Sequence, residues 1–279
     1  MRIPISTFRT SLFLLPFLCI SMTLMTACSE DALDKELEDS LDTDKMTPPE
    51  DYMADNPSNT NEKDENGKDG LASCQNVSDY IFQEIDGLIK IEFENAEFSD
   101  NWKLKTDGTN FSGKGYMVWE GAQQLGQPGN EKTAFTLQIE HPGTYQFLWK
   151  SAVKTGDSGS DHNDTWLRFG DADDFYAQKG NSVVYPMDTG KSSNPDGASK
   201  DGWFKIYRSG NDLDFKWQAK TFDNNAHDIF VVFENKGLYT MEISARSSGH
   251  AIDKFVLFKD IPQEDAIADT TDLSEVRCQ

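Results

Sequence analysis

The sequence predicts an all-β protein, folded as an antiparallel β-sandwich of the jelly-roll type. Apolar and polar residues alternate in short runs, which is the period of a strand with one buried face. Clusters of glycine, asparagine, aspartate and proline separate these runs, and no long amphipathic helix pattern is present. All six tryptophans lie between residues 79 and 259, a stretch that has the length of one domain.

Five runs show the strand pattern most clearly. In the first of them, Ile89, Ile91 and Phe93 alternate with charged residues and are expected to face the core. The last run, IDKFVLFK, is apolar on both sides and is expected to be a central strand. Two segments rich in turn residues interrupt the pattern and are expected to be long loops. The runs are 88–94, 133–140, 143–151, 238–246 and 252–259, and the loops are 154–164 and 178–203.

Residues 1–27 have the features of a secretion signal. Arg2 and Arg9 give a positively charged start, which is followed by a short apolar stretch, 11–24, that is too short to span a bilayer comfortably. The tripeptide MTA before Cys28 resembles the end of a bacterial lipobox, in which the cysteine becomes the lipidated N-terminus. The alternative is an ordinary cleaved signal followed by an incidental cysteine.

Residues 28–73 are expected to form a disordered acidic tether. Between residues 30 and 69 there are 15 acidic residues and 4 lysines, with few aliphatic residues to bury. An acidic run directly after the cysteine resembles the surface-export signals of Bacteroidota lipoproteins, so we expect a lipid-anchored protein at the outer membrane or cell surface. The net charge of −22 and the lack of a basic stripe argue against nucleic acid as a partner.

Two cysteines remain beyond the signal and the lipid site, Cys74 and Cys278. In an exported protein such a pair is usually oxidised, so a disulfide is expected. It would tie a C-terminal tail, 261–279, back to the start of the sandwich domain, 74–260. Two free thiols are the alternative.

Four motifs, taken in order, resemble the carbohydrate-binding modules of the family 6 and family 35 type, which are β-sandwiches of the galactose-binding-like class. IKIEFENAEFSDNW resembles their opening strand with its IEAE pattern, and GKGYMVWEG resembles the Gly-Tyr segment that follows. GTYQFLWKS resembles an inner strand, and GLYTMEISARSSGHAIDKFVLF resembles their closing pair of strands. The resemblance covers nearly the whole domain and implies the same fold and a carbohydrate ligand.

The resemblance also implies a structural Ca²⁺. The family commonly binds the ion with carboxylates of the opening strand and the aspartate of the last strand. The matching residues here are Glu92, Glu94 and Asp253. Hard oxygen ligands suit this cation. The alternative is that Glu92 and Glu94 are only the solvent-facing residues of an amphipathic strand.

HNDTWLRF is the densest short run of polar and aromatic side chains in the chain. If Leu167 and Phe169 point inward, then Asp164, Trp166 and Arg168 share the outward face. An exposed indole beside an acid and a guanidinium would suit a sugar, whose ring stacks on aromatic faces and whose hydroxyls bind planar polar groups. The alternative is that Trp166 packs under the loop and Asp164 pairs with Arg168.

Further candidates for carbohydrate contact come from other segments. Arg246 is suited to a carboxylate or sulfate of an acidic glycan, or it is the ion partner of Asp164. Trp119 and Trp217 are candidate stacking platforms, although tryptophans of sandwiches are more often core residues. The predicted carbohydrate-binding set is Trp119, Asn163, Asp164, Trp166, Arg168, Trp217, Arg246 and His250.

No nucleophile motif, metal-protease motif or phosphate-binding loop is present in the sequence. We therefore expect a non-catalytic protein that binds a polysaccharide or oligosaccharide at the cell surface. It would be anchored to the membrane by lipid only and would work beside glycan-processing proteins. The alternatives are an adhesion or assembly module that binds a protein and, less favoured, a small polysaccharide-degrading enzyme.

Overall fold

The structure, a computed structural model, describes residues 74–192 and 197–279. The predictions for the signal, for Cys28 and for the tether lie outside these residues. The strands are β1 (Tyr80–Gln83), β2 (Leu88–Glu92), β3 (Trp102–Lys105), β4 (Tyr116–Trp119), β5 (Thr133–Ile139), β6 (Gly143–Val153), β7 (Asp164–Arg168), β8 (Asp174–Lys179), β9 (Ser182–Val184), β10 (Phe204–Tyr207), β11 (Lys216–Trp217), β12 (Lys220–Thr221), β13 (His227–Phe233), β14 (Gly237–Ser244), β15 (His250–Phe258) and β16 (Val276–Cys278). The helices are the 3-10 turns η1 (Val77–Asp79) and η2 (Lys200–Gly202) and the short α1 (Gln263–Ile267).

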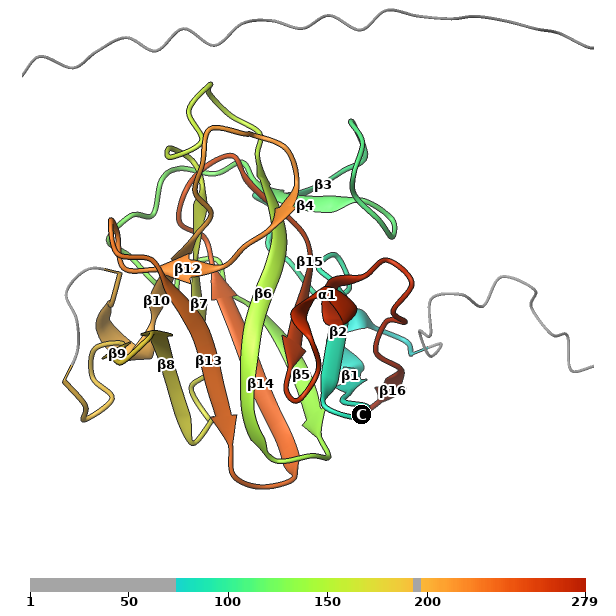
Figure 1. Ribbon diagram of the computed structural model, residues 1–279. Coiled ribbons are helices and arrows are strands. Elements are labelled where there is room, and N and C mark those ends of the chain that lie inside the picture. The colour runs from blue at the N-terminus through green and yellow to red at the C-terminus, as the bar shows by residue number, and fades with distance from the viewer. Residues whose placement is uncertain (1–73, 193–196) are drawn as a thin grey trace, which may run out of the picture. The chain divides into compact units, whose positions relative to one another are not determined.

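The strands form one continuous sheet that curls into two facing layers (Figure 1). One layer has the order β16–β1–β5–β14–β7–β10, and the other has the order β13–β6–β15–β4–β3. β12 pairs with both β10 and β13 and so joins the layers. β2 lies beside β15, β11 beside β6, and the hairpin β8–β9 beside β13. The prediction of an all-β sandwich is confirmed.

The core lies between the two layers and is rich in aromatic rings. The ring centroids of Phe135 and Phe255, from opposite layers, lie 5.1 Å apart, and those of Phe147 and Phe255 lie 5.9 Å apart. The alternating residues predicted to face the core in β2, β5, β6 and β14 are all buried. β15 is buried along its whole length because β6 lies on one side of it and β2 and β4 lie on the other. The central strand was therefore predicted correctly.

Two features differ from the prediction. β1 pairs with β5 in parallel, because the chain leaves its layer through β2, β3 and β4 before it returns. Residues 178–203 are not a single long loop, since they contain the end of β8, the whole of β9 and η2. The β8–β9 turn is Gly180-Asn181, and Gly180 has a φ of 56°, in the left-handed region that such hairpin turns require. This Gly-Asn pair was the overlooked sequence signal.

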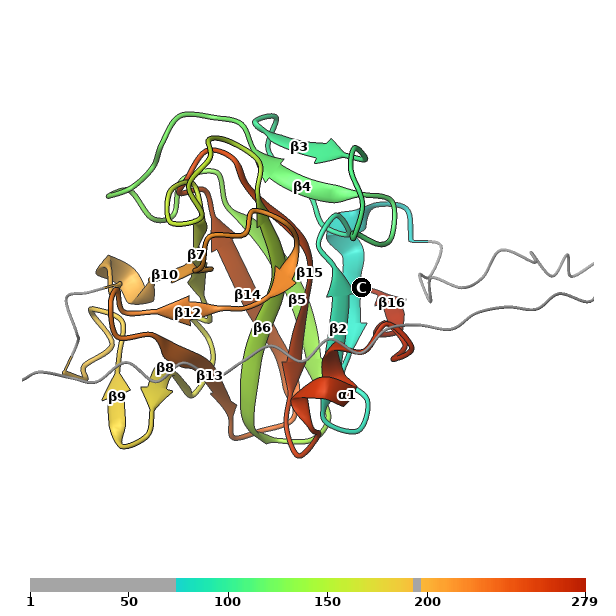
Figure 2. The same ribbon diagram turned by 45° about the horizontal axis from the view of Figure 1, so that its top comes forward.

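The expected disulfide joins Cys74 to Cys278 across a sequence separation of 204 residues. β16 pairs with β1 beside it, so the C-terminal end of the chain lies at the edge of one layer (Figure 2). The segment between α1 and β16 lies against β2, where the Ser274 amide donates to the Lys90 carbonyl at 2.8 Å. None of the helices in this part of the chain is long and apolar enough to cross a membrane.

Candidate functional site

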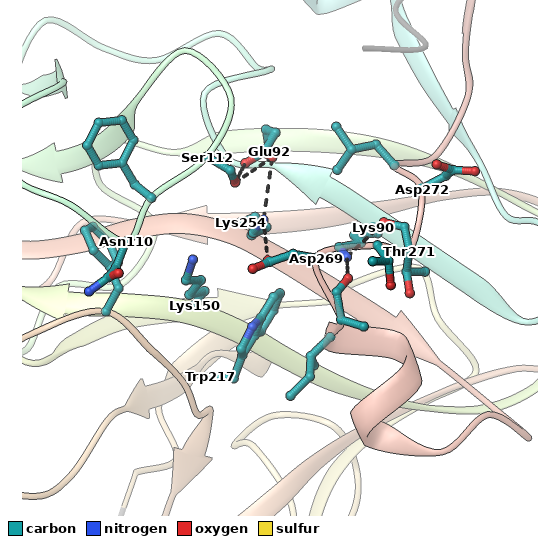
Figure 3. A pocket seen from close by; sticks show the side chains of 16 residues that line it. Lys90, Glu92, Asn110, Ser112, Lys150, Trp217, Lys254, Asp269, Thr271 and Asp272 are labelled. Carbon is teal, nitrogen blue, oxygen red and sulfur yellow. Dashed lines mark hydrogen bonds and ion pairs between the residues drawn. The ribbon is translucent and has the colours of Figure 1, made fainter. Parts of the chain in front are cut away.

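A pocket of about 1030 Å³ opens on the face of β2, β6 and β15 that points away from the core (Figure 3). Its floor is polar because strand residues alternate between the two faces. Lys90 and Glu92 line the pocket, whereas Ile89 and Ile91 between and beside them face the core. One wall is the loop 110–112, and another is the segment 267–273 that precedes β16.

One row of side chains crosses the pocket floor from strand to strand. Trp217 of β11 pairs with Lys150 of β6. Lys150 pairs with Lys254 of β15, and Lys254 pairs with Glu92 of β2. Directly opposite residues in a sheet have Cβ atoms about 5 Å apart, so an indole, two ammonium groups and a carboxylate lie side by side. We call these four residues the cross-strand row.

The two ammonium groups of the cross-strand row differ in how closely a carboxylate approaches them. Lys254 Nζ lies 3.8 Å from Glu92 Oε1 and 3.7 Å from Asp269 Oδ1, beyond hydrogen-bonding distance. Lys150 Nζ lies 3.2 Å from Asp253 Oδ2. The side chain of Lys254 is only 5 % exposed and that of Lys150 only 14 %. Two cations are therefore held almost inside the protein at the bottom of the pocket.

Lys90 has a different role, because its ammonium group holds the pocket wall. It donates to the carbonyls of Ala268 and Thr271, the latter at 3.0 Å. The Lys90 amide also donates to Ser274 Oγ at 3.1 Å. Burial, with the positive charge of Lys254 beside it, lowers the pKa of Lys90 to about 8. This lysine fixes the segment 268–274 to β2.

Aromatic side chains stand at the open side of the pocket. Phe111, Phe215 and Trp217 line it and are half-buried. Five of the six tryptophans of the chain are buried, so Trp217 is the one whose ring reaches solvent. In β11 it packs against the core on one side and the pocket on the other. Flat apolar faces beside polar donors are what small-molecule sites in proteins usually combine.

The three carboxylates predicted to bind calcium gather around the loop 112–114. Ser112 donates from Oγ to Glu92 at 2.7 Å and from its amide to Asp253 at 2.9 Å. The amide of Lys114 donates to Glu94 at 2.7 Å. Burial raises the pKa of each carboxyl above its usual range, that of Glu94 to about 7.

The fit of these carboxylates to a cation rests on two unpaired atoms. Glu94 Oε2 and Asp253 Oδ2 are buried and have no hydrogen-bond partner among the described residues, and a hard cation would satisfy both. Lys150 and Lys254 partly neutralise the other two carboxylates. As the side chains stand, no three His, Cys, Asp or Glu residues within 74–192 and 197–279 form a metal-binding group. The calcium site stays a prediction.

Asp164–Arg168 of HNDTWLRF form β7, and Asp164, Trp166 and Arg168 do share its outer face, but the first two are buried. The expectation of an exposed indole flanked by two charges is therefore wrong. Trp166 donates to the Gln124 carbonyl at 3.0 Å, and the guanidinium of Arg246 covers its ring at 4.9 Å. Arg246 forms an ion pair with Asp164, which was the alternative stated for that arginine.

Most other predicted carbohydrate-binding residues have intramolecular partners as well. Arg168 donates to Glu242 Oε2 at 2.6 Å and lies 4.8 Å from the Trp203 ring. Trp119 is a core residue, and its indole donates to the Ala122 carbonyl at 3.0 Å. A stacking surface for a ligand is therefore absent at Trp119, because its ring is only 1 % exposed.

His250 and Asn163 lie under the loops at one end of the sandwich. His250 is fully buried and lies 2.8 Å from Thr165 Oγ1, and burial lowers its pKa to about 3. Asn163 is buried and donates to the Arg208 carbonyl. Asn163 and Asp164 line a second, smaller pocket of about 530 Å³.

Of the eight predicted carbohydrate-binding residues, only Trp217 lines the larger pocket, which Glu92 of the predicted metal set also lines. Whether the other seven contact a ligand stays a prediction. The lysines of the pocket were missed. Their signal was an outward lysine next to a buried apolar residue in each of three strands, Lys90, Lys150 and Lys254.

No protein-family model and no curated protein sequence matches this chain. Among solved structures, similar folds include a GH26-CBM35 β-(1,4)-mannanase of Podospora anserina, at 17 % identity and a TM-score of 0.38, covering 67 % of this chain and 32 % of that one. A CBM35 from Cellvibrio japonicus Abf62 has 12 % identity and a TM-score of 0.34, covering 62 % and 94 %. The C-terminal CBM6 of LamC, a laminarinase from Zobellia galactanivorans, has 12 % identity and a TM-score of 0.31, covering 62 % and 99 %.

This chain spans about a third of the length of the mannanase. The strands and the pocket of this chain define its structural class: it is an all-β sandwich with a polar and aromatic pocket on the outer face of one layer.

Proposed function

We propose that this protein is a non-catalytic carbohydrate-binding protein and that the pocket over the cross-strand row is its site. The observation that carries the proposal is Trp217. It is the one tryptophan that is not buried, and it stands at the edge of a pocket whose floor bears polar groups. The resemblance of the strand motifs to carbohydrate-binding modules also supports it.

The chemistry of the pocket suits a sugar ring. One face of a sugar is a row of C–H groups, which pack on a flat aromatic ring, and its rim bears hydroxyls. Trp217 and Phe111 offer aromatic surface in the pocket. Asn110 and Lys150, which line the same pocket as Trp217, offer donors (Figure 3). A pocket that is open to the surface can hold one unit of a long polymer while the chain continues on either side.

Replacing Trp217 by alanine is expected to weaken polysaccharide binding by about thirtyfold or more, because truncating a central aromatic anchor costs about 2 kcal/mol or more. The measurement is the dissociation constant for each of mannan, dextran, β-glucan, arabinoxylan, polygalacturonate and a sulfated galactan. Trp217→Phe should retain part of the affinity. Leu238→Ala, at an exposed apolar residue on β14 of the opposite layer, is the matched control and should bind as the unchanged protein does.

Two results would contradict this proposal. Binding by a folded Trp217→Ala variant at full affinity would place the site elsewhere, and the pocket at Asn163 and Asp164 would be examined next. If the unchanged protein binds no polymer of the panel, the proposal of carbohydrate binding itself is contradicted. New reducing ends in the same mixtures would instead indicate a polysaccharide-degrading enzyme.

We also propose that Glu92, Glu94 and Asp253 bind a structural Ca²⁺. Calcium is expected to raise the free energy of unfolding, by about 2.7 kcal/mol when its free concentration is about 100 times the dissociation constant. The measurement is thermal unfolding with calcium and with a chelator. Glu94→Gln should abolish the difference, and Glu97→Gln, which changes an exposed carboxylate nearby, should not. If the unfolding temperature of the unchanged protein is the same with calcium and with the chelator, the calcium site is excluded.

We place the protein at the outer membrane or cell surface, anchored through lipid on Cys28 and working beside glycan-processing proteins. The lipobox-like MTA before Cys28 and the acidic segment after it support this location. A Cys28→Ala variant is expected to leave the membrane fraction, and its retention there would contradict lipid anchoring.

A further inference from the structure

Two lysines of the cross-strand row lie directly opposite each other on neighbouring strands. Lys150 of β6 pairs with Lys254 of β15, and both side chains point to the pocket. Like charges directly opposite in a sheet destabilise it. This destabilising pair of lysines lies in the floor of a pocket. It occurs in a protein whose acidic residues outnumber its basic ones, 48 to 26, over the whole sequence.

The ammonium group of Lys254 also lacks a hydrogen-bond acceptor. Its side chain is 5 % exposed, and its nearest carboxylate oxygens, on Asp269 and Glu92, lie at 3.7 and 3.8 Å. No side-chain or backbone acceptor in residues 74–192 and 197–279 lies within hydrogen-bonding geometry of it. The nitrogen reaches solvent only through the pocket, and an acceptor that binds it there gains more than it would at a fully hydrated lysine on the surface.

The acidic residues around the pocket do not neutralise all of the positive charge at its floor. Asp269 and Asp272 stand on the rim and are exposed, so water and salt screen them. Glu92 accepts from the hydroxyl of Ser112, while Asp253 accepts from the amide of Ser112 on one oxygen and pairs with Lys150 at 3.2 Å on the other. Lys90 is already bound by two carbonyls of the wall. From below, a ligand therefore meets Lys254, which has no close acceptor, and Lys150, whose ammonium group has three N–H donors and only one close carboxylate partner.

We propose that the pocket binds an acidic polysaccharide, with a carboxylate or sulfate group of one sugar unit seated between the ammonium groups of Lys150 and Lys254 and its ring against Trp217. This inference rests on the proposed carbohydrate-binding function and names the class of glycan. The cross-strand register supports the geometry, since Trp217, Lys150 and Lys254 are consecutive members of one row. Hydrogen bonds between charged groups contribute more than neutral ones.

The first test uses the full, unchanged chain and two pairs of polymers that differ only in charge. The pairs are polygalacturonate with its carboxyl-reduced form, and a sulfated galactan with its desulfated form. Binding of at least one acidic polymer about tenfold or more tighter than its neutral counterpart, with an affinity that falls as salt rises, is the expected result. The pair that shows the preference identifies carboxylate or sulfate as the group bound.

The outcomes separate this inference from the function on which it rests. Equal binding of the acidic and neutral forms, or binding of neutral polymers alone, would overturn the acidic class and leave carbohydrate binding intact. Binding of no polymer in either pair and none of the neutral panel would overturn both.

The second test asks whether Lys150 and Lys254 are the residues that bind the acidic group. Lys150→Gln and Lys254→Gln are each expected to reduce the preference for the acidic polymer about tenfold. Lys254→Arg, which keeps the charge and the pairing with Glu92, should retain most of it. Lys236→Gln removes an exposed lysine away from the pocket and is the matched control. A full preference in folded Lys150→Gln and Lys254→Gln variants would show that the acid binds elsewhere and would overturn the proposed site.

Discussion

Removal of the Cys74–Cys278 disulfide is expected to lower the free energy of unfolding by about 5 kcal/mol. The bond closes a loop between residues 204 positions apart, and loop-closure entropy of the unfolded chain grows with that separation. The native contacts near the bond are few, because β1 and β16 pair over only three residues. Most of the loss is therefore expected to come from a freer unfolded state.

The measurement is denaturant unfolding of a double Cys74→Ser, Cys278→Ser variant, which leaves no unpaired thiol in the domain. Its midpoint should fall. The slope of free energy against denaturant should rise, because an unfolded chain without the bond exposes more surface. A loss of less than about 1 kcal/mol would contradict the entropic account and would mean that the unfolded state keeps its ends together without the bond.

The second large effect is expected at Arg246. Its guanidinium forms an ion pair with Asp164 and covers the ring of Trp166 at 4.9 Å. The side chains of Arg246 and Asp164 are 15 % and 9 % exposed. Arg246→Met keeps much of the packing but leaves the Asp164 carboxylate buried without its cation. Such a change costs about 3 to 5 kcal/mol.

Two further variants show whether the buried charge is the cause. Adding Asp164→Asn to Arg246→Met should recover a large part of the loss, because Ser247 can still hydrogen-bond the amide oxygen. Lys132→Met is the matched control, since this lysine also pairs with a carboxylate, that of Glu242, but is 45 % exposed. Exposed pairs contribute about 0 to 1 kcal/mol. If Arg246→Met costs no more than Lys132→Met, the Asp164 carboxylate is hydrated and the pair is not a stabilising contact.

This ion pair also explains why HNDTWLRF was read partly wrongly. Alternation along a strand correctly placed Asp164, Trp166 and Arg168 on one face. It carried no information on what covers that face. The loop that contains Gln124 and the side chain of Arg246 cover that face. Gln124 lies 42 residues before Trp166 in the chain, and Arg246 lies 82 residues after Asp164. Burial of an outer strand face is decided by such distant segments.

Local pattern was enough for the features that depend on a single strand. The two-residue period predicted the core faces of β2, β5, β6 and β14, and the unbroken apolar run predicted β15 as a central strand. The two cysteines left over after the predicted signal and lipid site predicted the disulfide. Each of these follows from the chemistry of neighbouring residues, because pleating fixes which side chains share a face.

Only the tertiary structure decided the candidate site. Trp217, Lys150, Lys254 and Glu92 are far apart in the sequence, and each is simply an outward residue of its own strand. The pairing of β11, β6, β15 and β2, and the register of each pair, place them in one row. Alternation determines which face a side chain takes but not which strand lies beside it, because strand order and register are set by packing of the whole sandwich.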